Sequence, residues 1–140
     1  MMKKALVFSS GELQTIATAL IDLGNQTEKE ATSGNDKDRA KRYFSAGNEI
    51  RYLISYENTC IDKATTIVFD PEELKDIAGA LMAASYKAEY EAYLAGLRAE
   101  DAGTADLRNS EQSKKVILET QARELRSMAE TVKEYTEDNI

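Results

Sequence analysis

Hydrophobic residues recur along the chain in two arrangements, which predict short strands and longer helices. Two brief apolar runs that contain β-branched residues, 5–8 and 66–69, are typical of strands. Four longer segments repeat apolar residues at every third or fourth position, which predicts helices with one buried face. These helices are expected to begin near residues 10, 36, 71 and 109. One short strand followed by two helices is therefore predicted twice.

Each predicted strand ends at a signal that starts a helix. Ser9 precedes Glu12 by three residues, and Asp70 precedes Glu73 by three, which is the spacing of a capping box. Pro71 follows Asp70 at the first helical position, where its missing N–H costs no hydrogen bond. These acidic residues are therefore interpreted as helix caps.

The two halves of the chain resemble one another in sequence. At an offset of 61 positions, Val7-Phe8 falls on Val68-Phe69 and Glu12-Leu13 falls on Glu73-Leu74. The shared residues and the shared caps favour an internal duplication. The later helix of each half aligns at an offset of 75 instead, which predicts a 14-residue insertion with a polar loop near residues 100–106.

The predicted fold class is α+β and predominantly helical. It is an internal duplication of a strand-helix-helix unit, with four main helices and a minor two-stranded antiparallel sheet. Residues 1–140 are expected to form a single domain, with repeat 1 at about 3–60 and repeat 2 at about 64–138. Alternatively, the two apolar runs are only extended segments that lead into their helices.

Acidic residues outnumber basic ones, which restricts the partners that the chain can bind. Lys and Arg total 18 against 25 Asp and Glu, giving a formal net charge of −7. This charge opposes contact with a phosphate backbone, so no direct nucleic-acid binding is expected. Ordinary solubility explains such a charge, and mimicry of nucleic acid toward a basic protein surface is the sharper alternative.

The chain offers few groups for catalysis or metal binding. It has no histidine and a single cysteine, Cys60, which is interpreted as an idle thiol. No nucleotide-binding, metal-binding or nucleophile motif occurs, so neither a cofactor, a metal site nor enzyme activity is expected. No apolar run approaches the length of a membrane span, so a cytoplasmic location without membrane contact is expected.

The third helix carries a second apolar stripe besides its core face. This tyrosine stripe consists of Met82, Tyr86, Tyr90, Tyr93 and Leu97. At about 100° per residue it lies on a different side of the helix from the face that contains Leu74, Ile77 and Leu81. One core cannot easily cover both faces.

Two interpretations of the tyrosine stripe are open. Tyr43, Tyr52 or Tyr56 of the second helix packs against it, or it is an interface with another protein or with a second copy of the chain. The second interpretation rests on the enrichment of tyrosine and methionine at protein interfaces. The predicted partner-binding residues are therefore those of the stripe.

The leading functional hypothesis is a non-enzymatic protein-binding module that uses the tyrosine stripe or an acidic edge. A small, acidic, duplicated helical chain of this type resembles accessory proteins of phages and mobile elements, which implies inhibition of a host nuclease or defence system, as by anti-CRISPR proteins. The alternative is a protein that sequesters a small ligand or nucleotide in a pocket at the pseudo-two-fold or dimer interface. Arg39, Arg51 and Arg126 would then bind anionic groups.

Overall fold

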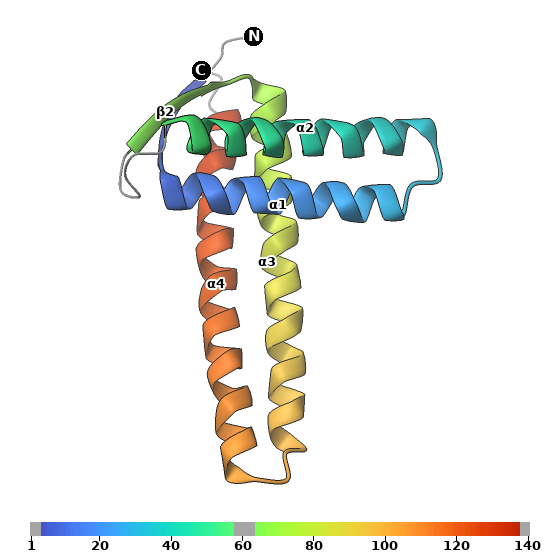
Figure 1. Ribbon diagram of the computed structural model, residues 1–140, viewed down its shortest axis with the longest axis vertical. Coiled ribbons are helices and arrows are strands. Elements are labelled where there is room, and N and C mark those ends of the chain that lie inside the picture. The colour runs from blue at the N-terminus through green and yellow to red at the C-terminus, as the bar shows by residue number, and fades with distance from the viewer. Residues whose placement is uncertain (1–3, 58–63, 138–140) are drawn as a thin grey trace.

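The computed structural model describes residues 4–57 and 64–137, which form two helical hairpins and one pair of short strands. Cys60, interpreted above as an idle thiol, lies outside the described residues. The elements in chain order are β1 (Lys4–Ser9), α1 (Ser10–Lys29), α2 (Gly34–Glu57), β2 (Ala64–Phe69), α3 (Pro71–Glu100) and α4 (Ala105–Glu137). The α1–α2 hairpin crosses one end of the longer α3–α4 hairpin at a steep angle (Figure 1).

Both predicted capping boxes are confirmed, and they fix where α1 and α3 begin. Ser9 Oγ accepts a hydrogen bond from the Glu12 N–H at 3.1 Å, and the Ser9 N–H donates to Glu12 Oε1 at 2.9 Å. Asp70 and Glu73 make the same reciprocal pair at the start of α3, at 2.9 and 3.2 Å. Each box satisfies two backbone N–H groups that the first helical turn leaves unpaired.

The predicted α+β class with a two-stranded antiparallel sheet is wrong, because the described chain is overwhelmingly helical. The four helices contain 20, 24, 30 and 33 residues, whereas each strand contains six. β1 lies antiparallel to β2, with Lys4 opposite Phe69 and Ser9 opposite Ala64, and the two form an isolated short pair instead of a layer on which helices pack. The sequence pattern located the two short β-branched runs, but it overestimated their part in the fold. A pattern of apolar residues does not say how much of the core an element buries.

The predicted repetition of one strand-helix-helix unit is also wrong as a description of this fold. α3 and α4 are much longer than α1 and α2, so the second half is not a structural copy of the first. The polar loop predicted near residues 100–106 coincides with the connection between α3 and α4, and the rest of the predicted insertion is helical. α3 continues to Glu100 and α4 begins at Ala105, four residues earlier than predicted, which leaves a connection of only residues 101–104.

The main hydrophobic core lies where α1 crosses the first half of α3. Leu13, Ile16 and Leu20 of α1 are fully buried there. They face the Leu74, Ile77 and Leu81 side of α3, as the apolar spacing predicted. Smaller contributions come from the strands, α2 and α4: Phe8, Phe69, Tyr43, Ile50, Ala129 and Val132. The core thus joins both hairpins at the crossing.

A glycine allows α2 to pack closely on α1. A Cβ at Gly47 would lie 2.7 Å from Ile21 Cγ1 and 3.1 Å from the carbonyl oxygen of Ala17, both closer than normal contact. Arg42 of α2 then reaches α3, where its Nε and Nη2 donate to the two carboxylate oxygens of Asp76 at 2.7 and 3.0 Å. This forked contact adds a geometrically specific tie between the hairpins.

Alanines form the contact between the distal parts of α3 and α4. Ala88, Ala92, Ala95 and Ala99 are buried and follow one another at spacings of four and three residues, as in a coiled coil. The Ser85 hydroxyl, also buried, donates to the Ala122 carbonyl oxygen at 3.0 Å. We call the part of this hairpin beyond the main core, residues 85–100 and 105–122, the arm; it extends away from α1 and α2 (Figure 1).

Candidate functional site

Exposed large apolar side chains are concentrated on the arm. Nine such side chains occur among the residues whose exposure is described, and seven of them belong to the arm. The seven are Tyr86, Tyr90, Tyr93, Leu97, Leu107, Val116 and Ile117. A concentration of exposed apolar side chains in one region marks an interaction site more often than scattered single residues do. The arm is therefore the candidate functional region.

The tyrosine stripe occupies the outer side of the arm's α3 helix. Tyr86, Tyr90 and Tyr93 are 57%, 61% and 61% exposed. Leu97 is also exposed, whereas Met82 is partly buried against the main core. Four of the five predicted partner-binding residues thus share one accessible face, and Met82 anchors the end of the stripe nearest the core.

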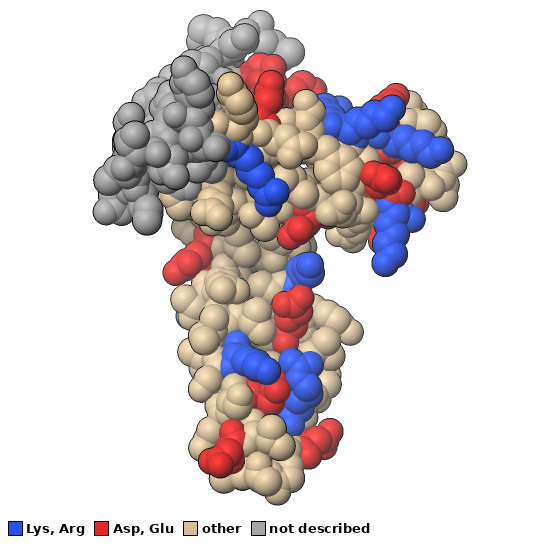
Figure 2. Space-filling view, viewed as in Figure 1, with Lys and Arg blue, Asp and Glu red and all other residues tan. Residues whose placement is uncertain are grey.

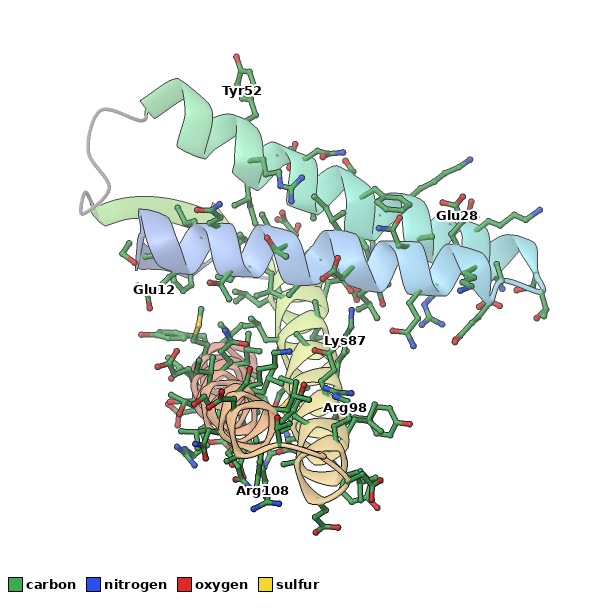
Figure 3. All side chains as sticks on the ribbon, turned by 60° about the horizontal axis from the view of Figure 1, so that its bottom comes forward. Glu12, Glu28, Tyr52, Lys87, Arg98 and Arg108 are labelled. Carbon is green, nitrogen blue, oxygen red and sulfur yellow. The ribbon has the colours of Figure 1, made fainter. Side chains whose placement is uncertain are left out.

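The described side chains of α2 do not cover this stripe. Tyr43 is buried in the main core, and Tyr52 is 68% exposed. Tyr52 projects from α2 away from the α3–α4 hairpin (Figure 3). The side chain of Tyr56 is outside the described set. The first interpretation, packing against α2, therefore finds no support among the described side chains. The exposed tyrosines face outward, where another chain could contact them.

Arg126 of α4 connects the two hypotheses drawn from the sequence. Its guanidinium lies over the ring of Tyr86, with 5.8 Å between Cζ and the ring centroid, and it is hydrogen-bonded to Glu89 of α3. Its Nε is buried and has no hydrogen-bond partner among the described residues. A residue proposed for anion binding therefore contacts a residue proposed for partner binding through a cation–π interaction.

The other two predicted anion-binding arginines do not join Arg126. Arg39 is exposed on α2 and lies 3.7 Å from Asp36 Oδ1. Arg51 is exposed on the same helix, twelve residues further, or about 18 Å along its axis. Neither residue lines the depression described next. The three arginines therefore do not form one site.

A shallow depression of about 270 Å³ lies between α2 and the start of α3. Its lining is mainly acidic and consists of Arg42, Ser45, Ala46, Glu49, Asp70, Glu72, Glu73 and Asp76. Burial raises the pKa of Glu73, and the nearby charges of Asp70 and Glu49 act in the same direction against a lowering by the Asp70 N–H. The hydrogen bond with Asp76 raises the pKa of Arg42. Asp70 and Glu73 cap α3 and Asp76 binds Arg42, and no described group of carboxylates is arranged to bind a metal ion.

An ion pair fastens the far end of the arm. Arg98 Nε donates to Glu111 Oε2 at 3.0 Å, and Lys114 Nζ lies 3.3 Å from Glu111 Oε1. The Arg98 hydrogen bond is the main reason that the pKa of Glu111 is lowered. Arg98 and Arg108 mark the tip region in Figure 3. This contact couples the last turn of α3 to the first turns of α4.

Charge does not define a continuous surface on the face shown in Figure 2. Basic and acidic side chains alternate there over both hairpins. None of the described helices combines the length and apolar character that crossing a membrane requires. The viewed face therefore shows no continuous acidic edge.

Sequence reasoning missed two contacts that position the stripe. The alanines of the arm were visible as a spacing of three and four residues, but Ala92, Ala95 and Ala99 were not recognised as a helix contact. The Arg42–Asp76 pair joins residues 34 positions apart, and nothing local in the sequence indicates it. The heptad spacing of the alanines could have indicated the first contact. The second contact could be found only from the folded structure.

Comparison with protein-family models, with curated proteins and with solved structures found no match to this chain.

Proposed function

We propose that this protein is a non-enzymatic protein-binding module whose contact surface is the tyrosine stripe on the arm. The observation that carries the proposal is the exposure of Tyr86, Tyr90 and Tyr93 on one face of α3. Tyrosine supplies a large apolar contact area together with a hydroxyl that can form hydrogen bonds at the rim. Three aligned tyrosines therefore form a ready interface.

The rigidity of the arm supports this proposal. The inner side of α3 is held against α4 by the alanines and by the Ser85–Ala122 hydrogen bond, so the stripe lies on a fixed helix. Arg126 restrains Tyr86 from the α4 side. Rings that are ordered before binding lose less conformational entropy in the complex.

The charged groups support a structural role better than a catalytic or anion-binding one. In the depression, Asp70 and Glu73 cap α3 and Asp76 pairs with Arg42, and on the arm Glu111 pairs with Arg98. We propose no enzymatic activity and no bound cofactor. An inhibitor of a host nuclease or defence system would use the stripe in the same way, by covering a surface on its target.

A photo-crosslinking residue placed at position 90 tests the proposal in cells that produce the protein. We expect it to trap a protein chain, because Tyr90 lies in the middle of the stripe and is 61% exposed. The matched control is the same residue at position 52, since Tyr52 is a comparably exposed tyrosine on a different helix. Equal trapping at both positions, or none at position 90, would contradict the proposal.

A further inference from the structure

The tyrosine stripe belongs to a longer seam with coiled-coil spacing. Gly79 and Ala83 precede Tyr86, Tyr90, Tyr93 and Leu97 at alternating intervals of four and three residues. Gly79 is open, because a Cβ added there would meet no atom within 4 Å. The seam from Gly79 to Leu97 is about 27 Å long and contains no charged residue. A surface with this spacing accepts another helix by the same knobs-into-holes packing as a coiled coil.

α3 therefore has two helix-binding faces, of which one is already used. Ser85, Ala88, Ala92, Ala95 and Ala99 form the inner face against α4 and also alternate in spacing by three and four. At 100° per residue the outer seam lies almost opposite this inner face, so it points away from α4. Helices with two such faces are typical of bundles with more than two helices.

The charges near the seam allow two copies to meet there. Between residues 79 and 98, α3 carries two basic residues, Lys87 and Arg98, and two acidic residues, Glu89 and Glu91. This segment is neutral, although the whole chain has a net charge of −7. If two copies met through acidic parts of their surfaces, their like charges would repel one another. The neutral segment of α3 does not cause this repulsion.

The area of the seam is sufficient for a two-fold contact. A tyrosine side chain presents on the order of 150–250 Å², and the three here are about 60% exposed. With Leu97 and the flanking aliphatic groups, each copy offers roughly 500 Å², so that two copies bury about 1,000 Å² in total. This is about the smallest area that a specific interface needs.

We propose that a second copy of this chain occupies the seam, bound about a two-fold axis with the two α3 helices antiparallel. This inference rests on the proposed function, because it identifies the protein that binds the tyrosine stripe as a second copy of the chain. The far end of the α1–α2 hairpin projects beyond α3 on the side opposite α4 (Figure 1). A parallel pair would bring both projecting ends together, whereas an antiparallel pair places them at opposite ends of the contact.

The antiparallel arrangement pairs large side chains along the whole stripe. Tyr90 lies opposite Tyr93 of the second copy, and Tyr86 lies opposite Leu97 of the second copy. The small residues Gly79 and Ala83 then lie where the tip of the second arm arrives, beside the projecting hairpin. The two arms together form a layer of four helices with the two α3 helices in the middle, and the contact between them buries the large side chains that the alanine contact lacks.

Sedimentation of the purified full chain over a wide range of concentration tests the inference. We expect a species of twice 15.5 kDa. Tyr90→Glu should weaken the dimer by about 30-fold or more, as expected for loss of a central aromatic contact. The same variant should keep its helical circular dichroism, because Tyr90 is exposed. Tyr52→Glu, the matched control, should remain a dimer.

Mixing charge variants distinguishes a two-fold contact from any other association. Tyr90 of each copy lies within one helical turn of its equivalent, so Tyr90→Glu and Tyr90→Lys chains should each be monomeric and should form a mixed dimer. A wild-type chain that is monomeric throughout, or a dimer that Tyr90→Glu leaves intact, would overturn the inference. If the wild type is monomeric and position 90 traps only a different protein, the proposed function stands and this inference fails. If position 90 traps nothing, both fail.

Discussion

The two helical hairpins arrange their large and small side chains in opposite ways. In the α1–α2 hairpin, large aliphatic residues such as Ile16 and Leu20 point into the main core, and Gly47 sits where the two helices approach most closely. In the arm, alanines such as Ala92 fill the interior, and Tyr90 and Tyr93 point outward. Large apolar side chains are therefore buried in the first hairpin and exposed on the arm.

This difference has an energetic consequence. A buried alanine contributes one methyl group, worth about 0.8 kcal/mol, whereas a fully buried leucine contributes about 1.5–3 kcal/mol. The interior of the arm therefore stabilises the fold less per residue than the crossing of α1 and α3. The large side chains of the arm are instead on the outer face of α3, where they are exposed.

The largest predicted effect sharpens the contrast between the buried and exposed leucines. Leu20→Ala should lower the free energy of unfolding by about 3 kcal/mol, because Leu20 is fully buried and its loss leaves a cavity in the main core. Leu107→Ala, at an exposed leucine of the arm, should change it by less than about 0.5 kcal/mol. Urea denaturation at one fixed protein concentration measures both values. Similar losses for the two variants would remove the contrast.

A second prediction compares a glycine at a close contact between helices with a glycine that is open. Gly47→Ala should cost about 1–3 kcal/mol, because the new methyl group would press on Ile21 and on the Ala17 carbonyl. Gly79→Ala is the matched substitution on α3, where a Cβ meets nothing within 4 Å. It should stabilise by up to about 1 kcal/mol through helix propensity. Thermal unfolding would show opposite shifts, and a gain in stability for Gly47→Ala would contradict the assigned packing.

Local signals in the sequence predicted the helix starts and their buried faces. The Ser9–Glu12 and Asp70–Glu73 spacings gave correct N-termini, because a capping box involves only residues three positions apart. The buried positions of α1 also followed from helical spacing. Capping and helical spacing depend on residues that are close in the sequence, so these predictions hold for any arrangement of the helices.

The fold class and part of the site depended on contacts that are distant in the sequence. The sequence placed the start of α4 four residues too late, because hydrophobic patterning undervalues the alanines through which α3 and α4 pack against one another. The tyrosine stripe was recognised from spacing alone. Its support by Arg126 was not, since Arg126 lies 40 residues from Tyr86 and reaches it only through the hairpin.

A smaller effect tests the hydrogen bond that locks the arm. Ser85→Ala should lower the free energy of unfolding by about 1 kcal/mol, because the buried hydroxyl no longer donates to the Ala122 carbonyl oxygen. Ser113→Ala, at an exposed serine of α4, is the matched control and should be nearly neutral. Hydrogen exchange of α3 amides would show faster opening of the arm in the first variant. Unchanged exchange would mean that the alanine contact alone holds the helices.

The smallest predicted effect concerns the capping box of α3 and depends on pH. Burial raises the pKa of Glu73, so the fold favours its neutral form. The resulting stabilisation is present below the pKa of the unfolded chain, about 4.3, and is lost as the pH rises through the folded value. Glu73→Gln cannot ionise but can still accept the Asp70 N–H, so its melting temperature should rise relative to the wild type between acidic and neutral pH. Glu12→Gln at the exposed box of α1 measures what the substitution does to a cap without this burial. If the difference in melting temperature between Glu73→Gln and the wild type did not change with pH, burial at the start of α3 would not disfavour the charged form of Glu73.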